Sequence, residues 1–140
     1  MGSGDSRAHS PEALARNTTA ALFAKNLDAC LRTGFPTLEE FRSLDKKSSA
    51  DQASKWHAQF EKELRKSWEG MQAILDTEIR DRREITDIRY DLEKNVNGTA
   101  DILVSFSVKS KRYAFSLDEC QKINGVWYVF DFDWIGPGGK

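Results

Sequence analysis

Apolar residues near the start of the chain recur at the spacing of an α-helix. Ser10, Pro11 and Glu12 predict where this helix begins, because a serine hydroxyl caps free N–H groups and proline fits the first helical position. We expect the helix to end at Gly34, with Pro36 reinforcing the stop. Its predicted buried side consists of Ala13, Ala20, Phe23, Ala24, Leu27, Cys30 and Leu31.

Two further helices are predicted before the pattern changes. Thr37 and Glu40 form a capping box, which predicts a short second helix. Its apolar residues are Leu38, Phe41 and Leu44. A third, long amphipathic helix is expected from about Ser48–Asp51 to about Arg80. Its apolar stripe consists of Trp56, Phe60, Leu64, Trp68, Met71, Leu75 and Ile79.

Beyond residue 83 the hydrophobic period falls from 3.6 to 2, which predicts strands. Four are expected, at about 84–94, 99–109, 111–120 and 126–135. Asn97-Gly98 and Asn124-Gly125 are typical of tight hairpin turns, and short links make neighbouring strands antiparallel. The predicted fold class is α+β, with three N-terminal helices packed on one face of a curved four-stranded antiparallel meander.

The length of 140 residues suits one domain with a substantial core. We expect a single domain at 10–136, a disordered leader or cloning remnant at 1–9, and a flexible tail at 137–140. The leader lacks the apolar stretch of a signal peptide, so a soluble protein is expected and export after removal of a signal stays open. No apolar run is long enough to cross a membrane.

Alternation along the last strand places Trp127 and Val129 on the outer face of the sheet. Together with Leu103 and Ile135 they are predicted to form an apolar patch on an otherwise polar face. Such a patch is typical of a contact surface, so we expect a protein partner or a second copy of the chain there. The residues predicted to face the helices are Ile88, Tyr90, Leu92, Ile102, Val104, Phe106, Val108, Tyr113, Phe115, Leu117, Val126, Tyr128, Phe130, Phe132 and Trp134.

Asp131 and Asp133 also fall on the predicted outer face. Two carboxylates at this spacing can hold a cation, but the strand supplies no further oxygen ligands, so a solvated pair and no metal site are expected. The formal net charge of −1 argues against nucleic-acid binding through a basic field. Cys30 and Cys120 are predicted to be separate free thiols packed as small hydrophobic side chains.

Helices followed by a meander whose last strand opens with Asn124, Gly125, Trp127 and Tyr128 resemble the nuclear-transport-factor-two-like superfamily, the cystatin-like α+β cone. The resemblance covers about residues 11–136 and implies this fold, with dimerisation through the sheet in many members. Its enzymes place an acid or a histidine in a pocket. No carboxylate lies on the predicted inner face here, so the resemblance implies a binding or accessory domain rather than an activity.

His57 lies within the apolar stripe of the third helix and is the best single candidate for acid–base chemistry, with Tyr128 as a hydroxyl donor. The alternative is a core or rim histidine, because no orienting carboxylate is evident. The aromatic rings can line a pocket for a small apolar ligand, and the alternative is that they are plain core residues. The predicted lining of the pocket consists of Trp56, Phe60, Trp68, Tyr90, Tyr113 and Tyr128.

The leading functional hypothesis is therefore a non-catalytic binding or protein-interaction domain that needs no cofactor. A small pocket enzyme of the isomerase or hydrolase type, using His57 with a tyrosine, is one alternative. An immunity or inhibitor protein that blocks a partner is the other.

Overall fold

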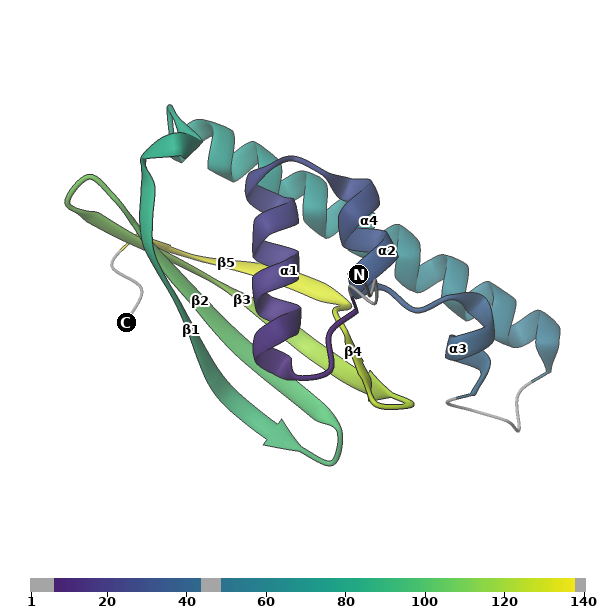
Figure 1. Ribbon diagram of the computed structural model, residues 1–140. Coiled ribbons are helices and arrows are strands. Elements are labelled where there is room, and N and C mark those ends of the chain that lie inside the picture. The colour runs from purple at the N-terminus through teal and green to yellow at the C-terminus, as the bar shows by residue number, and fades with distance from the viewer. Residues whose placement is uncertain (1–6, 44–48, 138–140) are drawn as a thin grey trace, which may run out of the picture.

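The computed structural model confirms the α+β fold class and describes residues 7–43 and 49–137. Figure 1 shows the helices on one side of a bent antiparallel sheet, with α1 crossing the strands and α4 running along the sheet and past its end. Three predicted features lie outside the described residues: the leader at 1–6, the segment 44–48 with Leu44, and the tail at 138–140.

The first predicted helix is two helices, α1 (Pro11–Phe23) and α2 (Leu27–Gly34). They are separated at Lys25, which adopts a left-handed φ of 58°. The N–H groups of Lys25 and Asn26 donate back to the carbonyls of Leu22 and Ala21, and these two bonds form a Schellman motif. Asn26 then caps α2, because its side chain accepts from the N–H of Ala29.

The other two predicted helices are confirmed. Thr37 and Glu40 make the expected capping box at α3 (Leu38–Arg42). Ser49 caps α4 (Ala50–Glu78), and a 3₁₀ turn, η1 (Arg82–Glu84), leads into the sheet. The apolar stripe of α4 is buried from its middle onward, at Leu64, Trp68, Met71 and Leu75, and Ile79 is buried just beyond the helix.

Within the described residues five strands form the sheet, because the last predicted strand is divided. They are β1 (Ile85–Val96), β2 (Thr99–Val108), β3 (Lys111–Ile123), β4 (Val126–Tyr128) and β5 (Asp131–Pro137). β1, β2 and β3 are antiparallel neighbours, and β4 and β5 both pair with β3. Both residues of Asn97-Gly98 and of Asn124-Gly125 have positive φ, as the predicted tight hairpin turns require.

A β-bulge changes which side chains of the last strand face the helices. Glu119 has a φ of 56°, and the β2–β3 register shifts beside it, so Leu117 and Cys120 both point into the core. The extra residue shifts the in–out alternation of β3 by one position. In the part of the predicted last strand opposite Cys120, side chains expected to face outward therefore face the core. Val129, which is fully buried, and Trp127, which is 5% exposed, therefore belong to the core.

The predicted apolar patch on the outer face is therefore wrong. Of its four residues only Ile135 is exposed, at 46%. Trp127 and Val129 are core residues, and Leu103 lies between β1 and β3 with only 6% of its surface exposed. The alternation rule places β5 correctly, because Phe132 and Trp134 pack with the core, but it fails for β4 beyond the bulge.

The segment before α1 is ordered from residue 7, which corrects the predicted disordered leader at 7–9. Ala8 is fully buried, and its carbonyl accepts a hydrogen bond from the N–H of Trp127 at 2.8 Å. This contact is an antiparallel bridge between Ala8 and Trp127. The start of the described chain therefore covers β4 on the side away from β3.

Helix α4 covers the edge of β5. Both backbone groups of Phe132 bond to Ser67: its N–H donates to the hydroxyl, and the hydroxyl donates to its carbonyl, each at 2.9 Å. The side chain of Phe132 packs edge-on against Trp68, with ring centroids 6.1 Å apart. One serine thus satisfies two peptide groups that an uncovered edge would leave to water.

We expect Ser67→Ala to lower the free energy of unfolding by about 1–3 kcal/mol, because it leaves the Phe132 N–H and carbonyl without partners against the helix. Urea denaturation checks this. The matched control is Ser54→Ala, an exposed serine on the same helix, which should change stability by no more than about 0.5 kcal/mol. Equal effects of the two substitutions would show that Ser67 does not hold β5 to α4.

Candidate functional site

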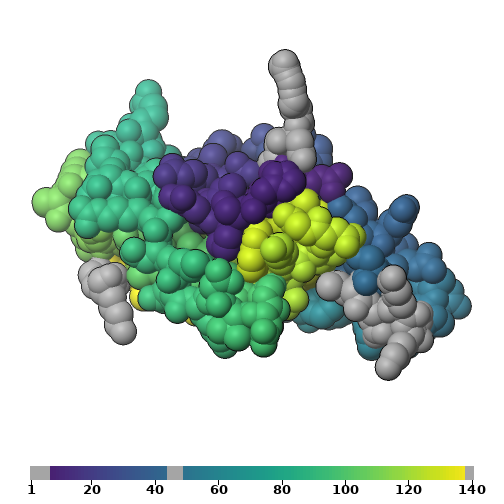
Figure 2. Space-filling view, turned by 60° about the horizontal axis from the view of Figure 1, so that its bottom comes forward, coloured from purple at the N-terminus to yellow at the C-terminus, as the bar shows by residue number. Residues whose placement is uncertain are grey.

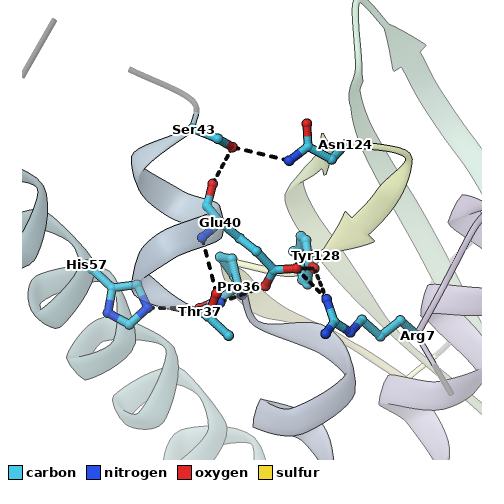
Figure 3. A network of polar contacts seen from close by, with 8 residues as sticks. All are labelled: Arg7, Pro36, Thr37, Glu40, Ser43, His57, Asn124 and Tyr128. Carbon is cyan, nitrogen blue, oxygen red and sulfur yellow. Dashed lines mark hydrogen bonds and ion pairs between the residues drawn. The ribbon is translucent and has the colours of Figure 1, made fainter. Parts of the chain in front are cut away.

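A polar cleft lies where the start of the described chain, α3 and the turn after β3 meet. It has a volume of about 390 Å³ and is lined by Arg7, Thr37, Glu39, Glu40, Ser43 and Asn124. Figure 3 shows that the acidic side chain of Glu40 points toward Tyr128 of β4 and Arg7, while His57 of α4 lies on the other side of α3. We call this feature the polar cleft.

Glu40 is the centre of the cleft. One carboxylate oxygen accepts from the N–H of Thr37 at 2.9 Å, and the other accepts from the Tyr128 hydroxyl at 2.7 Å and from the guanidinium of Arg7. Burial acts to raise the pKa of Glu40, but the hydrogen bonds from Thr37 and Tyr128 and the charge of Arg7 outweigh it, so the pKa lies below its ordinary value. The carboxylate is therefore ionised and fully engaged at neutral pH.

Tyr128 is a hydrogen-bond donor in this network. Burial and the bond to Glu40 raise the pKa of its hydroxyl to about 12. Arg7, whose guanidinium lies 3.2 Å from the hydroxyl oxygen, has its own pKa raised by that hydrogen bond and by the charge of Glu40. The Tyr128 hydroxyl keeps its proton and donates a hydrogen bond to Glu40. This bond ties β4 to α3.

His57 lies beside a cluster of aromatic rings rather than a carboxylate. Its Nε2 is 2.8 Å from the carbonyl oxygen of Pro36, so Nε2 carries the proton and donates it. The rings of Phe35 and Phe41 lie 5.2 and 5.7 Å from the imidazole centroid. The hydroxyl of Tyr128, the tyrosine predicted to act with His57, bonds to Glu40 and Arg7 instead.

The six residues predicted to line a ligand pocket lie in different surroundings. Trp68 and Tyr113 are core residues, packed on Phe132 and Phe106. The other four are spread over the molecule: Trp56 and Phe60 are exposed on α4, Tyr90 lies on β1, and Tyr128 borders the polar cleft. Three of these rings, Trp68, Tyr113 and Tyr128, are buried, but at separate places and not around a shared space.

Asp133 is exposed and Asp131 is half-buried on the outer face, opposite Ser116 and Asp118 of β3. Burial, followed by the charges of Asp101, Asp133 and Asp131, raises the pKa of Asp118. Within residues 7–43 and 49–137, no group of three or more acidic, histidine or cysteine side chains is arranged to hold a metal ion.

Cys30 and Cys120 are separate buried thiols, as predicted. Burial raises the pKa of Cys30 to about 12, and burial together with nearby Asp101 and Asp118 raises that of Cys120 as well. Both thiols are therefore protonated and unreactive in the folded protein.

A second surface runs along β1, which pairs only with β2 among the strands of the described chain. Its exposed apolar side chains are Ile88, Leu92 and Val96, which are 37%, 50% and 53% exposed. We call this strand edge with its three side chains the β1 edge surface. Figure 2 shows the β1–β2 hairpin, in green, at the molecular surface beside α1, in purple.

A groove of about 360 Å³ adjoins this surface, between the start of α1 and the sheet. It is lined by Ser10, Pro11, Glu12, Tyr90, Leu92 and Ile102. The guanidinium of Arg16 lies 5.0 Å from the centre of the Tyr90 ring, and burial raises the pKa of the Tyr90 hydroxyl. Apolar side chains, an aromatic ring and a free strand edge thus occur together at this position.

Comparison of the chain with protein-family models, with curated protein sequences and with solved structures finds no match in any of the three. In the described ranges, no helix combines the length and apolar character needed to cross a membrane.

The sequence reasoning missed the residues that form both surfaces. Arg7 was placed in a disordered leader, and Glu40 was read only as a capping residue. The contact between Glu40 and Tyr128 cannot be predicted from local sequence pattern, because the two residues lie 88 positions apart. The pattern of β1 did carry a signal: it interleaves apolar residues with five charged ones, which is typical of an edge strand.

Proposed function

We propose that this chain is a non-catalytic protein-interaction domain that contacts its partner through the β1 edge surface. The observation that carries the proposal is β1 itself: a strand of 12 residues with one side unpaired and three large apolar side chains exposed. An uncovered edge offers a row of N–H and C=O groups to an added strand, and adjacent apolar side chains give that strand something to bury.

The side chains with acid–base chemistry support binding rather than catalysis. His57 donates to a backbone carbonyl, and Tyr128 donates to Glu40, so both have internal partners. Glu40 is engaged by Thr37, Tyr128 and Arg7 together. Tyr128 keeps its proton and both carboxylate oxygens of Glu40 are engaged, so neither is available as a general base, while His57 lies beside aromatic rings rather than an orienting carboxylate.

The order of the elements supports a second part of the proposal, membership of the nuclear-transport-factor-two-like superfamily. Helices precede a bent antiparallel sheet and pack on one of its faces, as in a cystatin-like cone. The turn residues Asn124 and Gly125 lead into β4, which contains Trp127 and Tyr128.

Site-specific photo-cross-linking tests the proposed contact surface. A benzophenone amino acid is placed at Leu92, on the β1 edge surface, or at Ala73, an exposed position of α4 that serves as the control. Irradiation in the source cells should give protein adducts at position 92 and few or none at position 73. Equal yields at both positions, or adducts at 73 alone, would show that β1 is not the contact surface.

A further inference from the structure

The faces of β1 limit how two copies of this strand can pair. Arg89 and Asp91 point to the outer face of the sheet, and Tyr90 and Leu92 point to the helix face, since side chains alternate along a strand. Two copies that form one continuous sheet must place like faces together. Antiparallel self-pairing therefore has to be centred on a residue, because a centre between two residues would set an outer side chain opposite an inner one.

The charges of β1 then decide between the possible centres. The ladder with β2 is regular from Arg89 to Leu92, with a register shift on either side. A centre at Arg89 would set two guanidinium groups against each other, and a centre at Asp91 would set two carboxylates together. A centre at Tyr90 sets Arg89 opposite Asp91 of the second copy, and it does so twice because the pairing is two-fold.

The same centre also matches the exposed apolar side chains. Ile88, 37% exposed, lies opposite Leu92 of the second copy, 50% exposed in the single chain, and this contact also occurs twice. Tyr90 then lies on the two-fold axis, beside the groove at the start of α1. The register centred on Tyr90 thus satisfies both charge pairing on the outer face and apolar pairing on the helix face.

The rest of the sheet stops the association at two copies. The edge of β5 is covered by α4 through Ser67, and β4 is bridged by Ala8. Among the described strands, β1 is therefore the long one that has a single neighbour and no such covering contact, and pairing two copies uses both of these edges. A closed two-fold dimer follows rather than an open chain of molecules.

We propose that the partner of the β1 edge surface is a second copy of this chain, paired antiparallel about Tyr90. This inference rests on the proposed function, because it names the occupant of the same surface. The regular ladder is only four residues long, from Arg89 to Leu92, so the dimer is a reversible one that forms as protein concentration rises.

Charge reversal tests the register. In Arg89→Asp the two cross-strand pairs become carboxylate against carboxylate, and in Asp91→Arg they become guanidinium against guanidinium. Sedimentation equilibrium should show wild type approaching twice the 15.9 kDa chain mass as concentration rises. Each single variant should raise the dimer dissociation constant by about tenfold or more, since two favourable pairs become repulsive. The double variant Arg89→Asp/Asp91→Arg should return it to within about threefold of wild type.

Mixing the two single variants gives a sharper outcome. One chain then carries only carboxylates at positions 89 and 91, and the other carries only guanidinium groups, so both cross-strand pairs are opposite in charge. The mixture should form a heterodimer at concentrations at which each variant alone is monomeric. Circular dichroism of each variant establishes that its fold is unchanged.

Arg32→Asp is the matched control, because Arg32 is bonded to Asp28 on α2 much as Arg89 is bonded to Asp87, and the change in charge is identical. It should leave the dissociation constant unchanged. A wild type that stays monomeric, or variants and mixture that associate like wild type, would overturn the pairing about Tyr90. If the purified protein is monomeric but position 92 still cross-links to a different protein in cells, this inference fails and the proposed function stands.

Discussion

Trp127→Ala is expected to lower the free energy of unfolding by about 3–5 kcal/mol, the usual cost of truncating a large buried aromatic residue. Trp127 is 5% exposed and lies in the core with Val129, and its backbone is bridged to Ala8. Removing the indole leaves a cavity in the core. Urea denaturation followed by far-ultraviolet circular dichroism measures the loss.

Ile135→Ala is the matched control for this prediction. Ile135 belongs to the same set of four residues that alternation places on the outer face, but it is 46% exposed. Its truncation should change stability by no more than about 0.5 kcal/mol. Equal losses of stability from Trp127→Ala and Ile135→Ala would contradict the burial of Trp127. They would also contradict the assignment of this face of β4 to the core.

Glu40→Ala is expected to cost about 2–4 kcal/mol at neutral pH. The substitution removes the capping box of α3 and also leaves the Tyr128 hydroxyl and the Arg7 guanidinium without their shared acceptor. Glu39→Ala, on the same helix and the same cleft, is the control and should be nearly neutral because its side chain is exposed. Equal losses from the two variants would contradict the central position of Glu40.

The effect of Glu40 should also depend on pH in a defined direction. Its pKa is lower in the folded protein than in the unfolded chain, so its stabilisation is fully present above the unfolded value, about 4.3. It is lost as the pH falls through the lower folded value. The stability difference between wild type and Glu40→Gln should therefore be constant from neutral pH to about 5 and should shrink below that. A difference that grew on acidification would reverse the assigned shift.

Much of the fold follows from local pattern. The cap at Ser10, the capping box at Thr37, the stripe of α4 and the two Asn-Gly turns all act over a few residues, and each is found where the sequence predicts it. The break at Lys25 is also local. It was missed because apolar spacing continues across it, while the cap formed by Asn26 looks like an ordinary helix residue in the sequence.

The failures have a non-local origin. Glu119 adopts a left-handed φ that glutamate seldom takes, and its N–H bonds to Asp101 on the neighbouring strand. Alternation gives no warning of such a bulge, so every face assigned beyond it in β4 is reversed. Arg7 and Glu40 likewise act through Tyr128, a contact that depends on how the finished sheet meets α3.

The β1 edge surface shows how a correct strand prediction can still mislead about exposure. Ile88 and Leu92 were assigned to the face that meets the helices, but the helices do not cover this edge of the sheet, and both side chains are exposed. Their exposure, and not the buried Trp127, is what supports the proposed contact surface at β1.

The most direct measurement of contact at β1 is amide hydrogen exchange, followed by mass spectrometry, in dilute and in concentrated solutions of the purified protein. Pairing about Tyr90 predicts slower exchange across residues 85–96 as concentration rises, with exchange in α4 unchanged, and loss of that slowing in Asp91→Arg. Exchange in residues 85–96 that is independent of concentration, or slowing confined to another segment, would contradict it.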